Sequence, residues 1–293
     1  MGTSASSKGP GGGVPLIPPW VPPVPPMPSE PQNGDGDGPP DGKGQNGLAP
    51  SLPAPPQQAA QSPPSPLAPA ARFGGARLNL GRFASGGGDQ RYMQRSLGDY
   101  VRKGYGGRAT VVRRFGGTAS TAGNLYGALS IVASGQAAPA GSPLDPALLA
   151  GRSAREVIDA IIEAVRPPDG TQDAEASRAS IKDALSQILT AFPEADLLNL
   201  TEDQRGTAIE RFVAIDVHRR VMLDIGKAIQ EKAPTATVGL ARLKEVKEYI
   251  KQIVVAAFRK LRGIGQRVTT GRVNQVVRAA LEETFQVFEA YLR

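Results

Sequence analysis

Apolar residues recur at the spacing of amphipathic helices from about residue 118 to the C-terminus. Turn signals such as the Pro167 and Pro168 pair and Pro234 separate the apolar-periodic segments. The pattern predicts helices over residues 118–134, 153–165, 173–191, 201–232, 237–262 and 271–292. No run alternates polar and apolar residues over the length of a strand. The folded part of the chain is therefore expected to be all-α.

Two of these helices have a recognisable start. Ser153 with Glu156, and Thr201 with Gln204, each fit a capping box, in which two side chains satisfy backbone N–H groups reciprocally. Among the positions at helical spacing, Leu223 and Leu240 are expected to face the core together with their apolar neighbours.

The first 71 residues have a different composition, because they hold 20 of the 27 prolines and much glycine, serine and glutamine. Such a segment cannot bury enough apolar surface to offset the entropy of ordering it, so we expect a long disordered tail. Residues 15–27 alternate prolines with apolar groups and favour polyproline II. This strip, with the only tryptophan, Trp20, is either a docking segment or a stiff spacer.

The very start of the chain is a candidate modification site. Removal of Met1 would expose the unhindered amine of Gly2, and the small residues behind it would let this terminus enter a narrow pocket. Gly2 and Ser6 also satisfy the short myristoylation pattern, which requires a eukaryotic host.

Positive charge is concentrated between the tail and the helices. The formal net charge is +7, and residues 72–117 form a basic, Arg/Gly-rich transition region before a helical domain at 118–293. Its basic residues are Arg72, Arg77, Arg82, Arg91, Arg95, Arg102, Lys103, Arg108, Arg113 and Arg114. Such a block is suited to nucleic-acid phosphates or an acidic partner, and it is equally typical of a solvated face.

Two further patterns bear on nucleic-acid binding. An aromatic residue precedes two glycines at Phe73, Tyr105 and Phe115, which is compatible with base stacking or with glycines at the ends of short helices over 91–103 and 110–115. A second basic run could extend the first if the fold brings the two together. It consists of Arg259, Lys260, Arg262, Arg267, Arg272 and Arg278.

Sequence motifs for catalysis are lacking. The chain has no cysteine and a single histidine, His218, which lies within a predicted helix beside two arginines. It has no phosphate-binding loop and no nucleophile elbow. We therefore expect a protein that is not an enzyme and holds no metal or cofactor. No run is long and apolar enough for a membrane span or a secretory signal, so we expect a cytoplasmic protein.

Several segments resemble the QatB family of the bacterial Qat anti-phage system. They are the opening Met-Gly-Thr-Ser, the glycines at 11–13 with the Pro-Pro-Trp-Val-Pro run, and the block 135–171. Within that block, residues 142–156 and 165–171 are most similar, and 197–201 and 243–250 resemble the family as well. The resemblance covers the chain apart from a linker at about 30–70.

The resemblance implies a four-component system with a QatA-type ATPase, a QueC-like enzyme of the QatC type and a TatD-like nuclease of the QatD type. A QueC-like enzyme in such systems is associated with joining a deazaguanine to an N-terminal glycine. Carried onto this sequence, the acceptor would be Gly2, recognised with Thr3 and Ser4, and the helical body would act as an adaptor. A glycine amine with a pKa near 8 keeps a nucleophilic neutral fraction near neutral pH.

Overall fold

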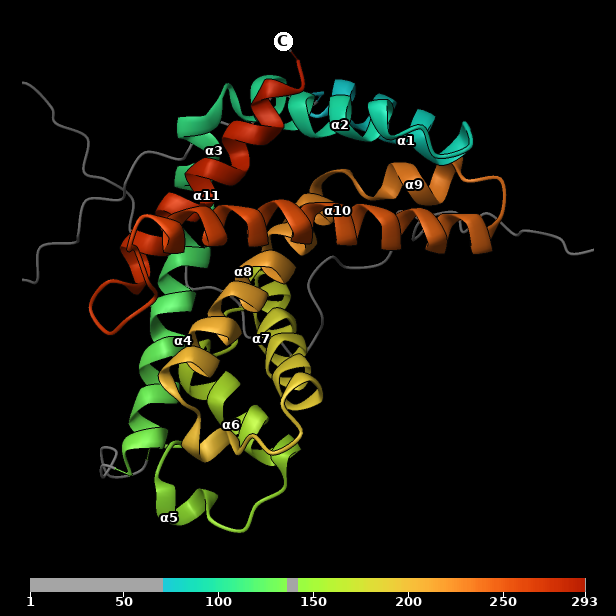
Figure 1. Ribbon diagram of the computed structural model, residues 1–293. Helices are drawn as coiled ribbons and strands as arrows, with labels where there is room; N and C mark the ends of the chain where they lie inside the picture. Colours follow the sequence, from blue (N-terminus) through green and yellow to red (C-terminus); the bar gives the residue numbers. More distant parts are fainter. Residues whose placement is uncertain (1–70, 136–141, 293) are drawn as a thin grey trace, which may run out of the picture. The chain divides into compact units, whose positions relative to one another are not determined.

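A computed structural model describes residues 71–135 and 142–292, which belong to one compact unit, Pro64–Arg293. Within these ranges the regular structure is helical and contains no strand (Figure 1). The α-helices are α1 (Gly74–Ser85), α2 (Gln90–Asp99), α3 (Arg108–Arg114), α4 (Gly116–Ser134), α5 (Pro146–Leu149), α6 (Ala154–Val165), α7 (Gln172–Ala191), α8 (Glu202–Ile225), α9 (Lys227–Lys232), α10 (Ala236–Gly263) and α11 (Val273–Ala290). A π-helical turn, η1 (Tyr100–Gly104), follows α2, and a 3₁₀ turn, η2 (Leu197–Asn199), precedes α8.

Helix α8 is central to the packing. It lies along α7 and also contacts α4 and α10 (Figure 1). Helix α11 packs against α10, α4 and α3, while α1 pairs with α2 and α9. Fully buried aromatic side chains join these helices, including Phe83 of α1, Phe212 of α8, Phe258 of α10 and Phe285 of α11.

The predicted all-α fold is confirmed for the described residues. Both capping boxes form, with the Ser153 hydroxyl accepting from the Glu156 N–H and the Glu156 carboxylate accepting from the Ser153 N–H at 2.9 Å. The single helix predicted over 201–232 is wrong, because α8 ends at Ile225 and α9 begins after Gly226 to pack on α1.

Two predicted core positions are wrong as well. Leu223 is 49% exposed and Leu240 is 69% exposed. Both lie near a helix end, Leu223 in the last turn of α8 and Leu240 close to the start of α10, where periodicity continues but fewer helices surround the side chain.

The basic segment 72–117 is helical and forms part of the core. Phe73 stacks on Tyr100 with ring centroids 5.3 Å apart, and Phe115 contacts Phe285 at 4.9 Å. Phe73 and Phe115 are buried, so neither is a base-stacking residue. The helices predicted over 91–103 and 110–115 correspond to α2 with η1 and to α3.

The predictions on the tail concern residues outside the described ranges, and Gly2, Thr3, Ser4 and Trp20 are among them. Of the helices that the structure describes, none is long and apolar enough to cross a membrane.

Candidate functional site

Some basic residues of the 72–117 segment are held in ion pairs. The Lys103 ammonium lies 2.7 Å from the carboxylate of Asp99, which is buried. Arg114 lies 2.5 Å from a carboxylate oxygen of Asp173. Burial alone would lower the pKa of Arg114, but Asp173 outweighs it and the pKa is raised. Each of these two positive charges therefore already has a carboxylate partner.

Two more cations contact backbone or rings. The Arg77 guanidinium donates twice to the carbonyl oxygen of Asp224, at 2.7 and 3.1 Å. Arg72 lies 4.4 Å from the ring centre of Phe73 and 4.8 Å from that of Tyr105, a cation–π arrangement. These contacts link the start of α1 to the end of α8, and the residue before Phe73 to Tyr105, which directly follows η1.

The remaining basic residues of the predicted nucleic-acid-binding segment are exposed. None of them has a carboxylate partner in the part of the chain that the structure describes. They are Arg82, Arg91, Arg95, Arg102, Arg108 and Arg113. Of these, Arg108 and Arg113 lie together on α3.

Helix α3 is positioned by its neighbours in sequence. Gly106 and Gly107 precede it with φ angles of 75° and 116°, which side-chain-bearing residues rarely adopt. Val111 is fully buried against the core, so the opposite face of this short helix is turned outward. α3 also packs on α11, which lies more than 150 residues later in the chain.

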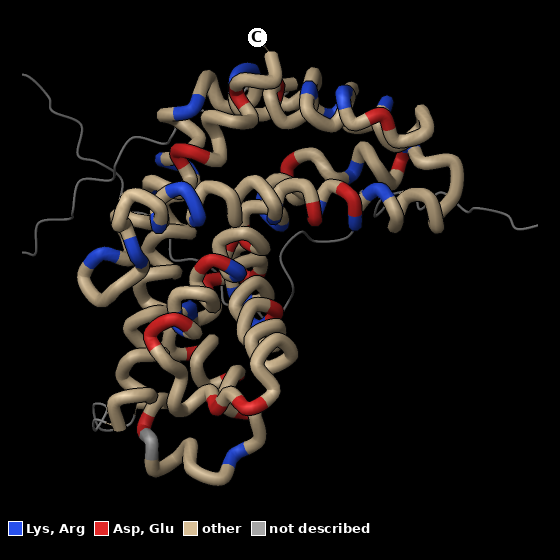
Figure 2. The backbone as a smooth tube through the Cα atoms, viewed as in Figure 1, with Lys and Arg blue, Asp and Glu red and all other residues tan. Residues whose placement is uncertain are grey.

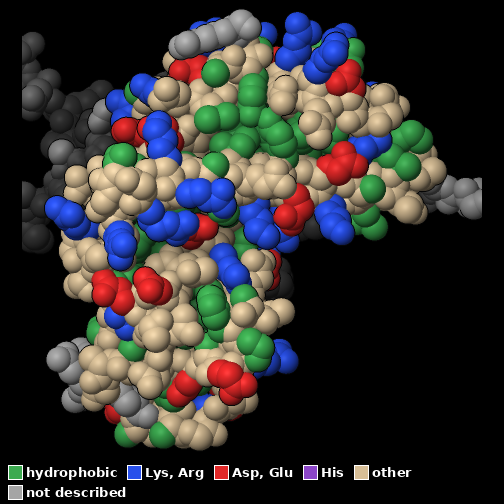
Figure 3. All heavy atoms as spheres, in the orientation of Figure 1, with side chains coloured by type: hydrophobic (Ala, Val, Ile, Leu, Met, Phe, Trp, Pro, Cys, Tyr) green, Lys and Arg blue, Asp and Glu red, His purple; other side chains and the backbone are tan. Residues whose placement is uncertain are grey.

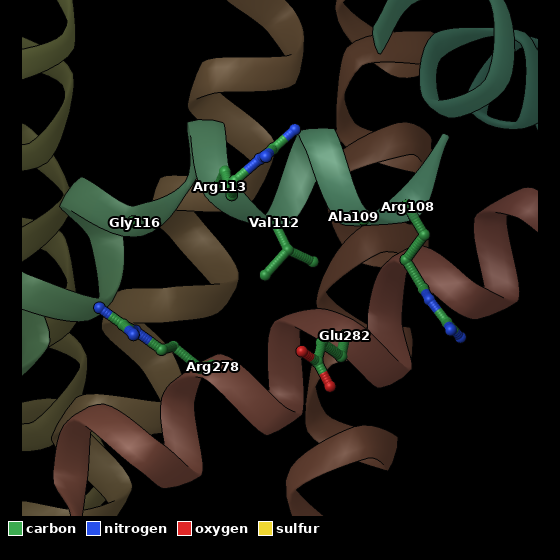
Figure 4. A pocket seen from close by; sticks show the side chains of 7 residues that line it. All are labelled: Arg108, Ala109, Val112, Arg113, Gly116, Arg278 and Glu282. Atoms are coloured by element: carbon green, nitrogen blue, oxygen red, sulfur yellow. The ribbon is translucent and has the colours of Figure 1, made fainter. Parts of the chain in front are cut away.

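An open cavity of about 520 Å³ lies where α3, the start of α4 and α11 meet (Figure 4). We call it the arginine groove, and its lining residues are Arg108, Ala109, Val112, Arg113, Gly116, Arg278 and Glu282. It joins the two basic segments through three arginines from α3 and α11, set against a single glutamate. The sequence left open whether the two basic segments meet, and in the structure they adjoin at Arg278.

The three guanidinium groups of the groove are spread along it. Figure 4 shows Arg278 reaching toward Gly116, Arg108 extending the opposite way and Arg113 pointing away from both, with Val112 between them. Arg108 donates to the Gln286 amide oxygen at 2.9 Å and Arg113 to the Thr110 hydroxyl at 3.3 Å. Neither these two nor Arg278 has a carboxylate partner among the described residues, so each guanidinium keeps free donors.

The rest of the second basic run is only partly available. Figures 2 and 3 show Lys and Arg gathered where α10 and α11 meet. Lys260 is paired with Glu283 and Arg262 with Glu210, both at 2.6 Å. Arg267 lines a different cavity, near Glu202 and Asp203 at the start of α8. The second run therefore does not form one continuous site.

A buried ionic network joins α4, α7 and α8 and was not found from sequence. Asp216 is fully buried and accepts from Thr118 at 2.6 Å, Ser177 at 2.9 Å and the Arg220 Nε at 2.9 Å. Arg220 also reaches Asp173, the partner of Arg114. The i, i+4 spacing of Asp216 and Arg220 was the available signal, but burial cannot be read from it.

A second cavity, of about 590 Å³, lies between α7 and α8. We call it the apolar groove, because Ala176, Ala179, Met222 and the exposed Leu223 form much of its lining. The charges at its edge are paired, with Arg219 lying 2.6 Å from Asp183. An apolar surface whose edge charges are paired in this way is suited to contact with another protein.

His218 also lines the apolar groove. Burial, and then the nearby charges of Lys247 and Arg219, lower its pKa to about 4, so the imidazole is neutral near pH 7. Its Nε2 has no hydrogen-bond partner within the described residues. In the same ranges no three His, Cys, Asp or Glu side chains are grouped to hold a metal ion.

Residues 106–288 match the family model described as QatB, Qat anti-phage system associated protein QatB. The chain belongs to the QatB family. No curated protein and no solved structure matches it. The match makes the protein a component of a Qat anti-phage system, and it includes every residue of the arginine groove and of the apolar groove. The tail, α1 and α2 precede the residues that match QatB.

Proposed function

We propose that this QatB-family protein is a non-catalytic, cytoplasmic subunit that presents Gly2 as the acceptor for a deazaguanine group. The QueC-like partner would supply the activated group, with Thr3 and Ser4 as the recognition residues. The observation that carries the proposal is family membership combined with the Met-Gly-Thr-Ser start, which resembles QatB.

The chemistry suits an unhindered amine. Attack of a neutral glycine amine on an adenylated carboxylate forms an amide and releases AMP. As flexible coil, a tail of about 70 residues has a root-mean-square span of roughly 45–50 Å, so its tip would reach an enzyme bound at a distance.

Intact-mass measurement after co-expression with the QueC-like enzyme tests the acceptor role. We expect one added deazaguanine mass on the N-terminal peptide, lost in Gly2→Ala and retained in the control Ser7→Ala, which lies outside the recognition residues. An unmodified peptide, or a mass shift that survives Gly2→Ala, would contradict the proposal.

The adaptor role is proposed for the apolar groove, where the ATPase or the nuclease would dock. Leu223→Asp places a charge at the groove and should abolish co-purification of whichever of the two partners, the ATPase or the nuclease, docks there. Leu148→Asp on α5 is the matched control, because Leu148 is also exposed (57%) but lies outside the groove. Equal retention of both partners by Leu223→Asp and Leu148→Asp would exclude the groove as the docking surface.

A further inference from the structure

The arginine groove places like charges together without compensating them. Arg108, Arg113 and Arg278 line one open cavity, and none has a carboxylate partner among the described residues. Glu282 is the only acid in the lining. Gathered cations of this kind repel one another and raise the local concentration of anions, so the arrangement favours a negatively charged ligand.

The geometry favours an extended polyanion over a single ion. A bound phosphate ion would require the guanidinium groups to converge on one point, whereas Figure 4 shows them directed to different places along the groove. Separate guanidinium groups suit successive phosphates of a chain, because each planar fork can bind one phosphate by two parallel hydrogen bonds.

One other feature of the groove supports this reading. Val112 and Ala109 give the groove an apolar stretch between the cations, against which a sugar or base can pack.

We propose that the arginine groove binds the backbone of nucleic acid, with Arg108, Arg113 and Arg278 each contacting a different phosphate. Glu282 opposes binding and limits the groove on one side. The site goes beyond the adaptor role and does not depend on modification of Gly2.

The test is equilibrium binding of the full chain to a short fluorescent oligonucleotide, single-stranded and duplex, over a range of salt concentrations. The triple variant Arg108→Ala/Arg113→Ala/Arg278→Ala should bind more weakly and with a flatter salt dependence. For three lost contacts the slope of log K against log salt falls by about 2–3, since each contact contributes about 0.7 on single strands and about 0.9 on duplex.

The matched control is Arg91→Ala/Arg95→Ala/Arg102→Ala, which removes the same charge from exposed arginines outside the groove. It should keep most of the affinity and slope. Glu282→Gln should bind more tightly than the natural chain, an increase that a damaged fold cannot produce.

Four results would overturn the proposal. The first is a groove triple variant that binds as tightly as the natural chain. The second is a control triple variant that loses as much affinity as the groove triple variant, which would show that binding depends only on the total positive charge. Polyglutamate could compete as well as nucleic acid, which would assign the groove to an acidic protein. Weaker binding of nucleic acid by Glu282→Gln would show that the nucleic acid contacts the protein outside the arginine groove.

Discussion

At the scale of single residues, Asp216 is a fully buried charge whose stability depends on its hydrogen-bond partners. Its carboxylate has no exposed surface and accepts hydrogen bonds from Thr118, Ser177 and Arg220. A buried charge is tolerated only when it is paired and hydrogen-bonded, and removing one partner leaves the other uncompensated. The network therefore makes the junction of α4, α7 and α8 dependent on one side chain.

Asp216→Ala is expected to lower the free energy of unfolding by about 3–5 kcal/mol, because Arg220 would stay buried beside fewer acceptors. Urea denaturation measures the loss. Asp183→Ala is the matched control, since Asp183 forms an ion pair with Arg219 at the surface, and its loss should be about 0–1 kcal/mol. Similar losses in the two variants would contradict the role given to burial.

His218 gives the protein a pH dependence that can be isolated, because it is the only histidine. Its pKa is about 4 in the fold, against 6.5 for an unperturbed histidine. The unfolded chain therefore binds a proton as the pH falls below about 6.5, while the folded chain binds it only near 4. Stability is expected to decrease over this interval as the pH falls.

Between about pH 7 and pH 5 we expect a loss of about 1–2 kcal/mol in the free energy of unfolding. His218→Gln should remove this loss, and urea denaturation at the two pH values measures it. An unchanged pH dependence in His218→Gln would show that carboxylates cause the effect.

At the scale of helices, sequence was informative where apolar periodicity and caps agreed. Ser153 and Thr201 marked the starts of α6 and α8 correctly because a capping box is a local interaction. α1 was missed because glycines and arginines interrupt its pattern, although Leu80 and Phe83 bury one face. The arginine groove depends on α3 packing on α11, and a contact between helices so far apart in the chain leaves no local signal.

Two glycines in helical turns allow a direct test of close packing. A Cβ at Gly104, at the end of η1, would lie 2.5 Å from the ring of Phe73, which is stacked on Tyr100. Gly104→Ala should therefore destabilise the protein by about 1–3 kcal/mol. A Cβ at Gly127, inside α4, meets nothing within 4 Å, so Gly127→Ala should stabilise by about 0.5–1 kcal/mol. Thermal unfolding of both variants gives the comparison, and changes of the same sign would contradict it.

At the scale of the whole described body, one hydrophobic cluster extends from Phe73 near the start to Phe288 in α11. α1 and α2 precede the residues that match QatB, yet Leu80 and Met93 belong to the same cluster as Phe212 and Phe258. A contiguous core of this kind usually corresponds to one cooperative unit. We therefore expect α1 and α2 to unfold together with the family-matched helices.

Leu80→Ala tests this cooperativity. Leu80 is 1% exposed, so the substitution should lower the free energy of unfolding by about 2–5 kcal/mol. Leu78→Ala is the matched control on the same helix, because Leu78 is 57% exposed and its loss should stay within about 0.5 kcal/mol. Hydrogen exchange read by mass spectrometry should show α7 and α10 losing protection in Leu80→Ala as much as α1 does. Loss confined to α1 and α2 would show that they are a separate unit, joined to the QatB-matched helices without sharing their stability.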